Sequence, residues 1–260
     1  MELLTRCDDA QVAYLHMNAP ERLNALSDEM LAALQAQIDS LSNDRETRVV
    51  VLSGAGKAFC AGHDLKQMQA GRQSEDGGRA YFAGLFDRCA KVMSGLARLP
   101  QPVIAQVHGI ATAAGCQLVA SCDMAIAAQG ARFGVNGVNI GLFCSTPMVA
   151  LSRNVHRKQA FEMLTTGRFV EAEEAQAMGL VNRVVAPGSL SSETRALAET
   201  VAGKLSAAVK IGKRGFYDQI EMGLDDAYAH TAAIMVDNML WRDTEEGIAA
   251  FLEKRSPDWA

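Results

Sequence analysis

Two short stretches of the chain are rich in glycine and alanine, at places where backbone N–H groups can be left without partners. The first is residues 59–66, FCAGHDLK, which follow a buried-strand pattern and a glycine turn. The second is residues 109–117, GIATAAGCQ, which lead into a helical segment whose first N–H groups lack acceptors inside the helix. Two such donors, held in place, stabilise the negative charge that develops on a carbonyl oxygen when the adjacent carbon is deprotonated or attacked. Taken singly, either stretch is better explained by a tight turn or by helix packing, whereas both together predict an anion-stabilising site.

Cys144 is the main candidate for a side-chain nucleophile. It follows Asn136 and Asn139 and precedes Ser145. A helix that begins near Pro147 would activate the thiol if it lowered the pKa of Cys144. The sequence assigns no histidine or aspartate partner to this cysteine, so we expect it to line a pocket instead.

Three histidines and one aspartate are further candidates for chemistry. His108 and Asp123 each stand at a strand end, where a hydrogen bond within the fold is the expected role, and His156 is expected on a helix surface. His63 lies inside the first stretch, and an imidazole with an unperturbed pKa near 6.5 can line a pocket or transfer a proton. We expect His63 to be a bystander.

Strand and helix patterns alternate through the first half of the chain and would position both stretches. Continuous apolar runs rich in β-branched residues predict strands that are buried on both faces. Ser27 is expected to cap a helix whose apolar residues recur at helical spacing. The predicted strands are residues 12–17, 48–54, 103–107 and 123–127, and a long helix is predicted over residues 79–98. Alternation of this kind predicts an α/β fold.

Beyond residue 146 the pattern becomes helical. Only residues 181–185 interrupt it with strand character. The last predicted helices carry apolar residues that a monomer would leave exposed, which predicts a subunit contact there. These residues are Leu240, Trp241, Ile248, Phe251 and Leu252.

Composition excludes several classes of protein. A length of 260 residues, with 49% hydrophobic and 21% charged residues, is typical of a globular chain with one large core. The formal net charge of −5 argues against a surface built to bind nucleic acid. No apolar run is long enough for a membrane span, and the first nine residues do not resemble a secretory signal. Six scattered cysteines without a paired motif predict reduced thiols and a cytoplasmic protein.

With both stretches in this order, the sequence resembles the crotonase (enoyl-CoA hydratase/isomerase) superfamily, and within it the subgroup that lacks both hydratase glutamates. The resemblance covers nearly the whole chain. Further segments that are similar to the family, in family order, are residues 18–20, 24–25, 166–167, 172–175, 179–181, 245–247 and 250–255.

The resemblance implies a spiral core of repeated ββα units over residues 1–195, followed by a helical oligomerisation region over residues 196–260. It implies a homotrimer or homohexamer, an acyl-CoA thioester as ligand, no metal, and coenzyme A as part of the substrate instead of a permanently bound cofactor. By resemblance, the backbone N–H groups of His63 and Ala114 would form an oxyanion hole. The residues implied to contact acyl-CoA are Arg22, Ala25, Ala61, Asp64, Leu65, Lys66, Gly115, Cys144, Phe251 and Lys254, the last two from a neighbouring subunit.

Neither position of the two hydratase glutamates holds an ionisable residue. By alignment with the family, the first position is Gln117 and the second is Gly137. A Gln amide orients water but is no general base, and general acid–base groups contribute about 10²- to 10⁴-fold each. Two hypotheses follow: an enzyme that stabilises a thioester enolate with little hydratase activity, and a non-catalytic acyl-CoA binding protein. Glutamates at both positions are expected to restore hydration.

Overall fold

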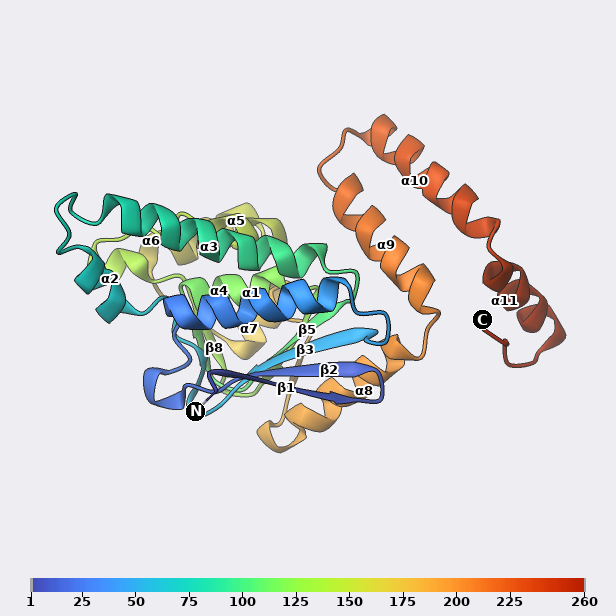
Figure 1. The fold of residues 1–260 in the computed structure, drawn as a ribbon, viewed down its shortest axis with the longest axis horizontal. Coiled ribbons are helices and arrows are strands. Elements are labelled where there is room, and N and C mark those ends of the chain that lie inside the picture. Colours follow the sequence, from blue (N-terminus) through green and yellow to red (C-terminus); the bar gives the residue numbers. More distant parts are fainter. Residues whose placement is uncertain (1, 260) are drawn as a thin grey trace.

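The computed structural model describes residues 2–259 and shows two β-sheets covered by helices (Figure 1). The larger sheet has six strands in the order β1-β2-β3-β5-β7-β10, and the smaller has four in the order β4-β6-β8-β9. The larger sheet consists of β1 (Leu4–Asp9), β2 (Val12–Met17), β3 (Val49–Gly54), β5 (Val103–Val107), β7 (Met124–Ala128) and β10 (Arg183–Val185). The smaller sheet consists of β4 (Ala58–Cys60), β6 (Ile110–Thr112), β8 (Arg132–Gly134) and β9 (Phe169–Glu171).

Eleven α-helices and three 3-10 helices of the described chain surround these sheets. The first half contains η1 (Pro20–Arg22), α1 (Asp28–Ser42), α2 (Leu65–Gly71), α3 (Arg79–Arg98) and α4 (Ala114–Ser121). The second half contains η2 (Gly137–Ile140), α5 (Pro147–Asn154), α6 (Arg157–Thr166), α7 (Ala172–Ala177), η3 (Pro187–Ser189), α8 (Leu190–Ala202), α9 (Ser206–Gln219), α10 (Leu224–Met239) and α11 (Arg242–Glu253).

The fold repeats a ββα unit. The strand pairs β3/β4, β5/β6 and β7/β8 each give one strand to each sheet and are each followed by helices. Because β4 and β6 are parallel neighbours in the smaller sheet, their carboxyl ends meet at one edge. The two small-residue stretches leave the sheet at that edge.

The core explains why the strand predictions are confirmed. In β3, Val49 and Val51 pack with α8, while Val50 and Leu52 belong to the main core with α1, so alternate side chains are buried on opposite faces. The predicted cap is also confirmed, because the Ser27 hydroxyl accepts the Met30 N–H at 3.2 Å and α1 begins at the next residue. The α/β fold class is therefore correct.

The shortest strands were not predicted from the sequence. The prediction of a single strand beyond residue 146 is wrong, because β9 (Phe169–Glu171) pairs antiparallel with β8. Three residues are too few to show an alternating pattern, and β9 exists because the edge of β8 is available to it. Among residues 2–259, no helix has both the length and the apolar character of a membrane span.

The last three helices project from the core as a C-terminal arm, α9–α11 (Figure 1). A buried ion pair fixes the base of this arm, where the Lys213 ammonium contacts the Asp123 carboxylate at 2.7 Å. Lys213 also donates to the carbonyl oxygens of Leu96 and Gln101, and the Tyr217 hydroxyl donates to Asp123 at 2.8 Å. Residue 195, the last residue of the predicted spiral core, lies inside α8, and α8 packs on the larger sheet. The arm therefore separates from the core only after α8 (Figure 1).

Candidate functional site

The two small-residue stretches lie against each other at the carboxyl ends of β4 and β6. Gly62 is so close to the start of α4 that a Cβ on it would lie 3.3 Å from the Ala114 nitrogen and 3.0 Å from the Thr112 carbonyl oxygen. A Cβ on Gly115 would lie 2.1 Å from the carbonyl oxygen of Cys60. The small residues therefore allow α4 to approach the first stretch, as expected for a site that brings two backbone donors together.

Ala114 provides the first of these donors. It is the first residue of α4, so its N–H has no acceptor within the helix. Ala113, immediately before it, has φ 50° and ψ −118°, which is a strained conformation for a residue with a side chain. The hydrogen bond from the Ala113 N–H to the Gly134 carbonyl, at 2.8 Å, helps to hold this strained turn.

His63 provides the second donor. Residues 61 and 62, just before His63, form the backbone hydrogen bonds to residues 23–26. The Ala61 N–H donates to the Leu23 carbonyl oxygen at 3.0 Å, and the Leu26 N–H donates to the Gly62 carbonyl oxygen at 2.7 Å. None of the hydrogen bonds within residues 2–259 has the His63 N–H as its donor. Two free backbone N–H groups therefore belong to neighbouring segments, in the order that the sequence predicted.

Asn24 holds the loop that supports the first stretch. It is fully buried, its side-chain amide donates to the carbonyl oxygens of Ala55 and Ala58 at 2.8 and 2.9 Å, and its side-chain oxygen accepts the Ala19 N–H at 3.0 Å. Its φ of 51° is tolerated better by Asn than by most residues. The asparagine of the 24–25 segment is thus a structural residue.

His63 is half-buried, but both of its ring nitrogens are buried and neither has a hydrogen-bond partner. Its ring meets that of Phe86 edge to face, with 5.8 Å between the ring centroids. Burial lowers the pKa of His63, and the opposing influences of the Leu26 backbone and the Asp28 carboxylate do not reverse this. The imidazole is therefore neutral at neutral pH.

The positions aligned with the missing glutamates differ in what they can hold. Gln117 is 5% exposed, and its side-chain oxygen has no hydrogen-bond partner. Gly137 is enclosed, because a Cβ there would lie 2.3 Å from the Leu142 carbonyl oxygen and 2.9 Å from the Cys144 sulfur. The expectation that glutamates at both positions raise hydration in an otherwise intact pocket stays a prediction, and a side chain at residue 137 requires the backbone around it to shift.

Cys144 is a buried acceptor. The Gly137 N–H donates to its sulfur at 3.3 Å. Burial raises the pKa of Cys144, and this N–H opposes the rise only in part. The thiol is therefore not activated as a nucleophile, and it packs against Gly137 at the start of η2, while its role in lining a ligand pocket stays a prediction.

The sequence did not predict the contact between Thr112, in the second stretch, and Asn136. The Thr112 hydroxyl donates to the Asn136 side-chain oxygen at 2.7 Å and ties the end of β6 to the residue that precedes η2. The two residues are far apart in the chain, so no local pattern could pair them. The strain at Ala113 is also invisible in the sequence, because alanine gives no signal for positive φ.

Residues 8–260 match the family described as enoyl-CoA hydratase/isomerase. The chain belongs to this family. It is 46% identical over 244 residues to human enoyl-CoA hydratase domain-containing protein 3, mitochondrial, covering 94% of this chain and 79% of that protein. The crystal structure of an enoyl-CoA hydratase from Mycobacterium smegmatis is 54% identical, with a TM-score of 0.96 over 100% of this chain and 99% of that one. An enoyl-CoA hydratase from Bacillus anthracis is 32% identical, with a TM-score of 0.92 over 99% of both chains.

The predicted ligand contacts of this enoyl-CoA hydratase/isomerase family member differ in their surroundings. Ala25 and Ala61 are half-buried where their two loops run side by side, and Gly115 packs on Cys60. Arg22, Leu65 and Lys66 are exposed.

Asp64 is engaged in the fold. Its carboxylate caps α2 by accepting the N–H groups of Lys66 and Gln67 at 2.8 and 3.3 Å. Phe251 and Lys254 lie at the far end of the arm, away from the other predicted contacts in this chain (Figure 1). The remaining candidates have the structural roles expected of them: His108 bonds to the Gly56 carbonyl at 3.0 Å and Asp123 anchors the arm.

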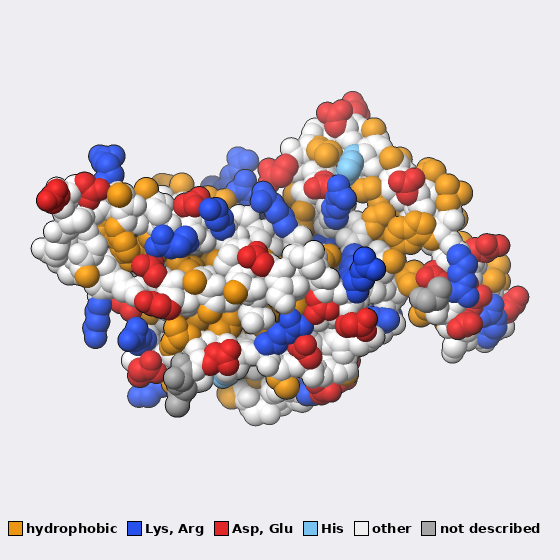
Figure 2. Space-filling view, in the orientation of Figure 1, with side chains coloured by type: hydrophobic (Ala, Val, Ile, Leu, Met, Phe, Trp, Pro, Cys, Tyr) orange, Lys and Arg blue, Asp and Glu red, His pale blue; other side chains and the backbone are white. Residues whose placement is uncertain are grey.

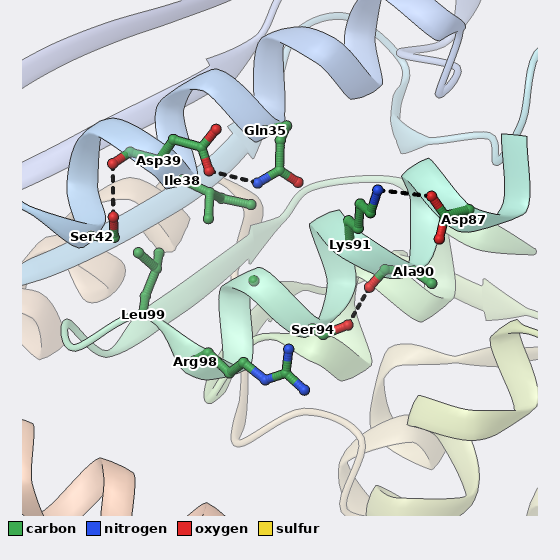
Figure 3. A pocket seen from close by; sticks show the side chains of 11 residues that line it. Gln35, Ile38, Asp39, Ser42, Asp87, Ala90, Lys91, Ser94, Arg98 and Leu99 are labelled. Atoms are coloured by element: carbon green, nitrogen blue, oxygen red, sulfur yellow. Dashed lines mark hydrogen bonds and ion pairs between the residues drawn. The ribbon is translucent and has the colours of Figure 1, made fainter. Parts of the chain in front are cut away.

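Two surface grooves of the described chain lie away from this site. The one in Figure 3, of about 490 Å³, lies between α1 and α3. Three of its charged side chains have partners in their own helices: Lys91 pairs with Asp87 at 2.9 Å, and Asp39 accepts a hydrogen bond from Gln35 at 2.8 Å. The other, of about 590 Å³, lies beside the base of the arm. Neither groove contains a residue of the two stretches, so the candidate site rests on backbone geometry and not on cavity size.

Proposed function

We propose that the chain binds an acyl-CoA thioester whose carbonyl oxygen accepts hydrogen bonds from the His63 and Ala114 N–H groups. The observation that carries this proposal is the placement of two unpartnered backbone donors on neighbouring segments, with Gly62 packed against Ala114. Fixed donors of this kind stabilise an enolate without the reorganisation that water would need. The strained turn at Ala113 supports it, since strain is retained where the surrounding structure enforces it.

In this proposal coenzyme A contacts Arg22 in η1, Lys66 in α2 and the arm of a second copy of the chain. Arg22 and Lys66 are exposed cations that suit phosphate groups. Phe251 is 82% exposed, so it is free to contact a ligand held by another subunit. We propose a homotrimer or homohexamer for the same reason, because the arm leaves many apolar side chains uncovered (Figure 2). These include Tyr228, Met235, Val236, Leu240, Phe251 and Leu252.

Hydratase activity is weak in this proposal, because neither Gln117 nor the closed position 137 supplies a carboxylate. A second candidate function is non-catalytic binding of acyl-CoA. The enclosure of Gly137 favours it, since the usual second acid–base group is excluded by the backbone and not only by the residue type.

The test combines binding with turnover. Purified protein is titrated with crotonyl-CoA and with saturated acyl-CoAs of increasing length, while thioester absorbance is recorded and products are followed by mass spectrometry. We expect saturable binding, a shift of the thioester absorbance towards longer wavelength as the carbonyl is polarised, and little hydration. Binding of coenzyme A without any acyl-dependent spectral change would contradict the oxyanion role.

The matched variant is Ala114→Pro, which deletes one donor N–H at the first helical position, where a missing N–H costs the helix no internal hydrogen bond. Loss of an oxyanion donor costs about 10²- to 10³-fold in catalysed systems. We expect this variant to bind free coenzyme A as the wild type does and to lose the spectral shift. Circular dichroism checks that α4 and the rest of the fold persist.

A further inference from the structure

His63 has an unusual combination of neighbours. Its own backbone N–H is one of the two free donors, and both of its ring nitrogens are enclosed without a partner. Burying a polar atom without a hydrogen-bond partner is unfavourable, so two such atoms in one ring call for an explanation. The ring contacts Phe86 and no charged side chain at hydrogen-bond distance. A ligand whose carbonyl oxygen accepts from the His63 N–H is bound by the same residue that carries this imidazole.

Other acid–base groups of the site are absent or engaged. Gln117 does not titrate, and Gly137 has no side chain. The Asp64 carboxylate caps α2, and the Asp28 carboxylate accepts a hydrogen bond from Arg88 at 2.5 Å. Burial raises the pKa of Cys144, which removes its thiolate at neutral pH. Among the described residues of the two stretches and their neighbours, the His63 imidazole is the group left that can accept a proton at neutral pH.

We propose that His63 is a catalytic residue that removes and returns a proton of the acyl group, in place of the missing glutamates. This inference rests on the proposed function. A neutral ring nitrogen takes the proton from the α-carbon, and the electrons of the broken C–H bond form the C=C bond of the enolate. The negative charge moves to the carbonyl oxygen, where the two N–H groups hold it. The imidazolium then returns a proton to the same carbon, or to the γ-carbon of a β,γ-unsaturated acyl group, which moves the double bond to the α,β position.

The test is exchange of α-hydrogens for deuterium. Butyryl-CoA has no double bond, so incubation in D₂O with mass spectrometry of the recovered thioester reports α-proton transfer alone. We expect the wild type to accelerate exchange, and His63→Ala to lower this acceleration by about 10²- to 10⁴-fold, the usual contribution of a general base. The backbone donor remains in this variant, so butyryl-CoA affinity should change by only a few fold.

Two variants separate catalysis from a structural role. Added imidazole should restore exchange in His63→Gly, a rescue that a merely structural histidine would not show. His63→Gln keeps a polar side chain of similar size, and it should fold and still lack exchange. His156→Ala, at the exposed start of α6, removes an imidazole elsewhere and should exchange as the wild type does.

The outcomes distinguish this inference from the function on which it rests. A wild type that binds butyryl-CoA and shifts the thioester absorbance of crotonyl-CoA, but catalyses no exchange, overturns the role of His63 and leaves the oxyanion site standing. Exchange at the wild-type rate in His63→Ala and His63→Gln also overturns it. No binding and no spectral shift in the wild type would remove the proposed function itself.

Discussion

Gly115→Ala is the substitution for which the structure makes the sharpest prediction. Helix propensity alone predicts a gain of about 0.5–1 kcal/mol for replacing a helical glycine by alanine. In α4, however, the new Cβ would lie 2.1 Å from the Cys60 carbonyl oxygen, far inside the 3.4–4 Å of ordinary contact. Either the helix or β4 must move by more than an ångström, and overpacking of this kind costs about 1–3 kcal/mol. We therefore expect a net loss of about 1–2 kcal/mol in the free energy of unfolding.

The same displacement acts on ligand binding. Ala114 precedes the substituted residue, so moving α4 away from β4 separates the two backbone donors, and a misplacement of 1 Å costs about 10²-fold in well-oriented sites. Urea unfolding and the crotonyl-CoA spectral shift measure the two effects. The matched control is Gly212→Ala in α9, where a Cβ meets nothing within 4 Å, so stability should rise and the spectral shift should persist. If Gly115→Ala were as stable as that control, with an unchanged spectrum, the close approach of the two stretches would be refuted.

Three further predictions concern the fold and the site, one of them with a matched control. Lys213→Met leaves the Asp123 carboxylate without its buried cation and should lower the free energy of unfolding by about 3–5 kcal/mol, whereas Arg214→Met, which removes an exposed ion pair, should cost about 0–1 kcal/mol in the same urea titration. Asn24→Ala leaves several buried backbone groups without partners, so calorimetry should show a loss of about 2–4 kcal/mol. Because the pKa of His63 is lower in the folded chain than the unfolded value of about 6.5, wild-type stability should fall as pH falls below about 6.5, by up to about 1.4 kcal/mol per pH unit. Urea titrations at pH 7 and 5 should show a smaller fall in His63→Gln, with His16 and His108, whose pKa values are also lowered, accounting for the remainder.

Strands and helices that are long enough to show a period could be predicted from the sequence. The helix over residues 79–98 and the strands over residues 12–17 and 103–107 have the predicted bounds, because burial on defined faces fixes their apolar positions. These bounds depend on patterns that are local in the chain. The resemblance named the N–H groups of His63 and Ala114, and neither has a backbone acceptor in the described chain, but their role as oxyanion donors stays a prediction.

Features that depend on contacts between distant residues could not be predicted. The three-residue strands β4, β6, β8 and β9 exist only as partners of one another. The isolation of the His63 ring nitrogens follows from what packs around them, and the raised pKa of Cys144 follows from burial that outweighs the nearby N–H of Gly137. These are properties of packing, which residue type and spacing do not encode.

The enclosure of Gly137 has a consequence for how this chain can change. A carboxylate at this position is separated from the present sequence by a conformational barrier, because the Leu142 carbonyl and the Cys144 sulfur occupy the space that its Cβ requires. A substitution that reshapes residues 138–144 must therefore come first, and by itself it brings no acid–base group. The effect of a glutamate at residue 137 thus depends on the background in which it appears, so we expect that this single substitution does not by itself supply an acid–base group.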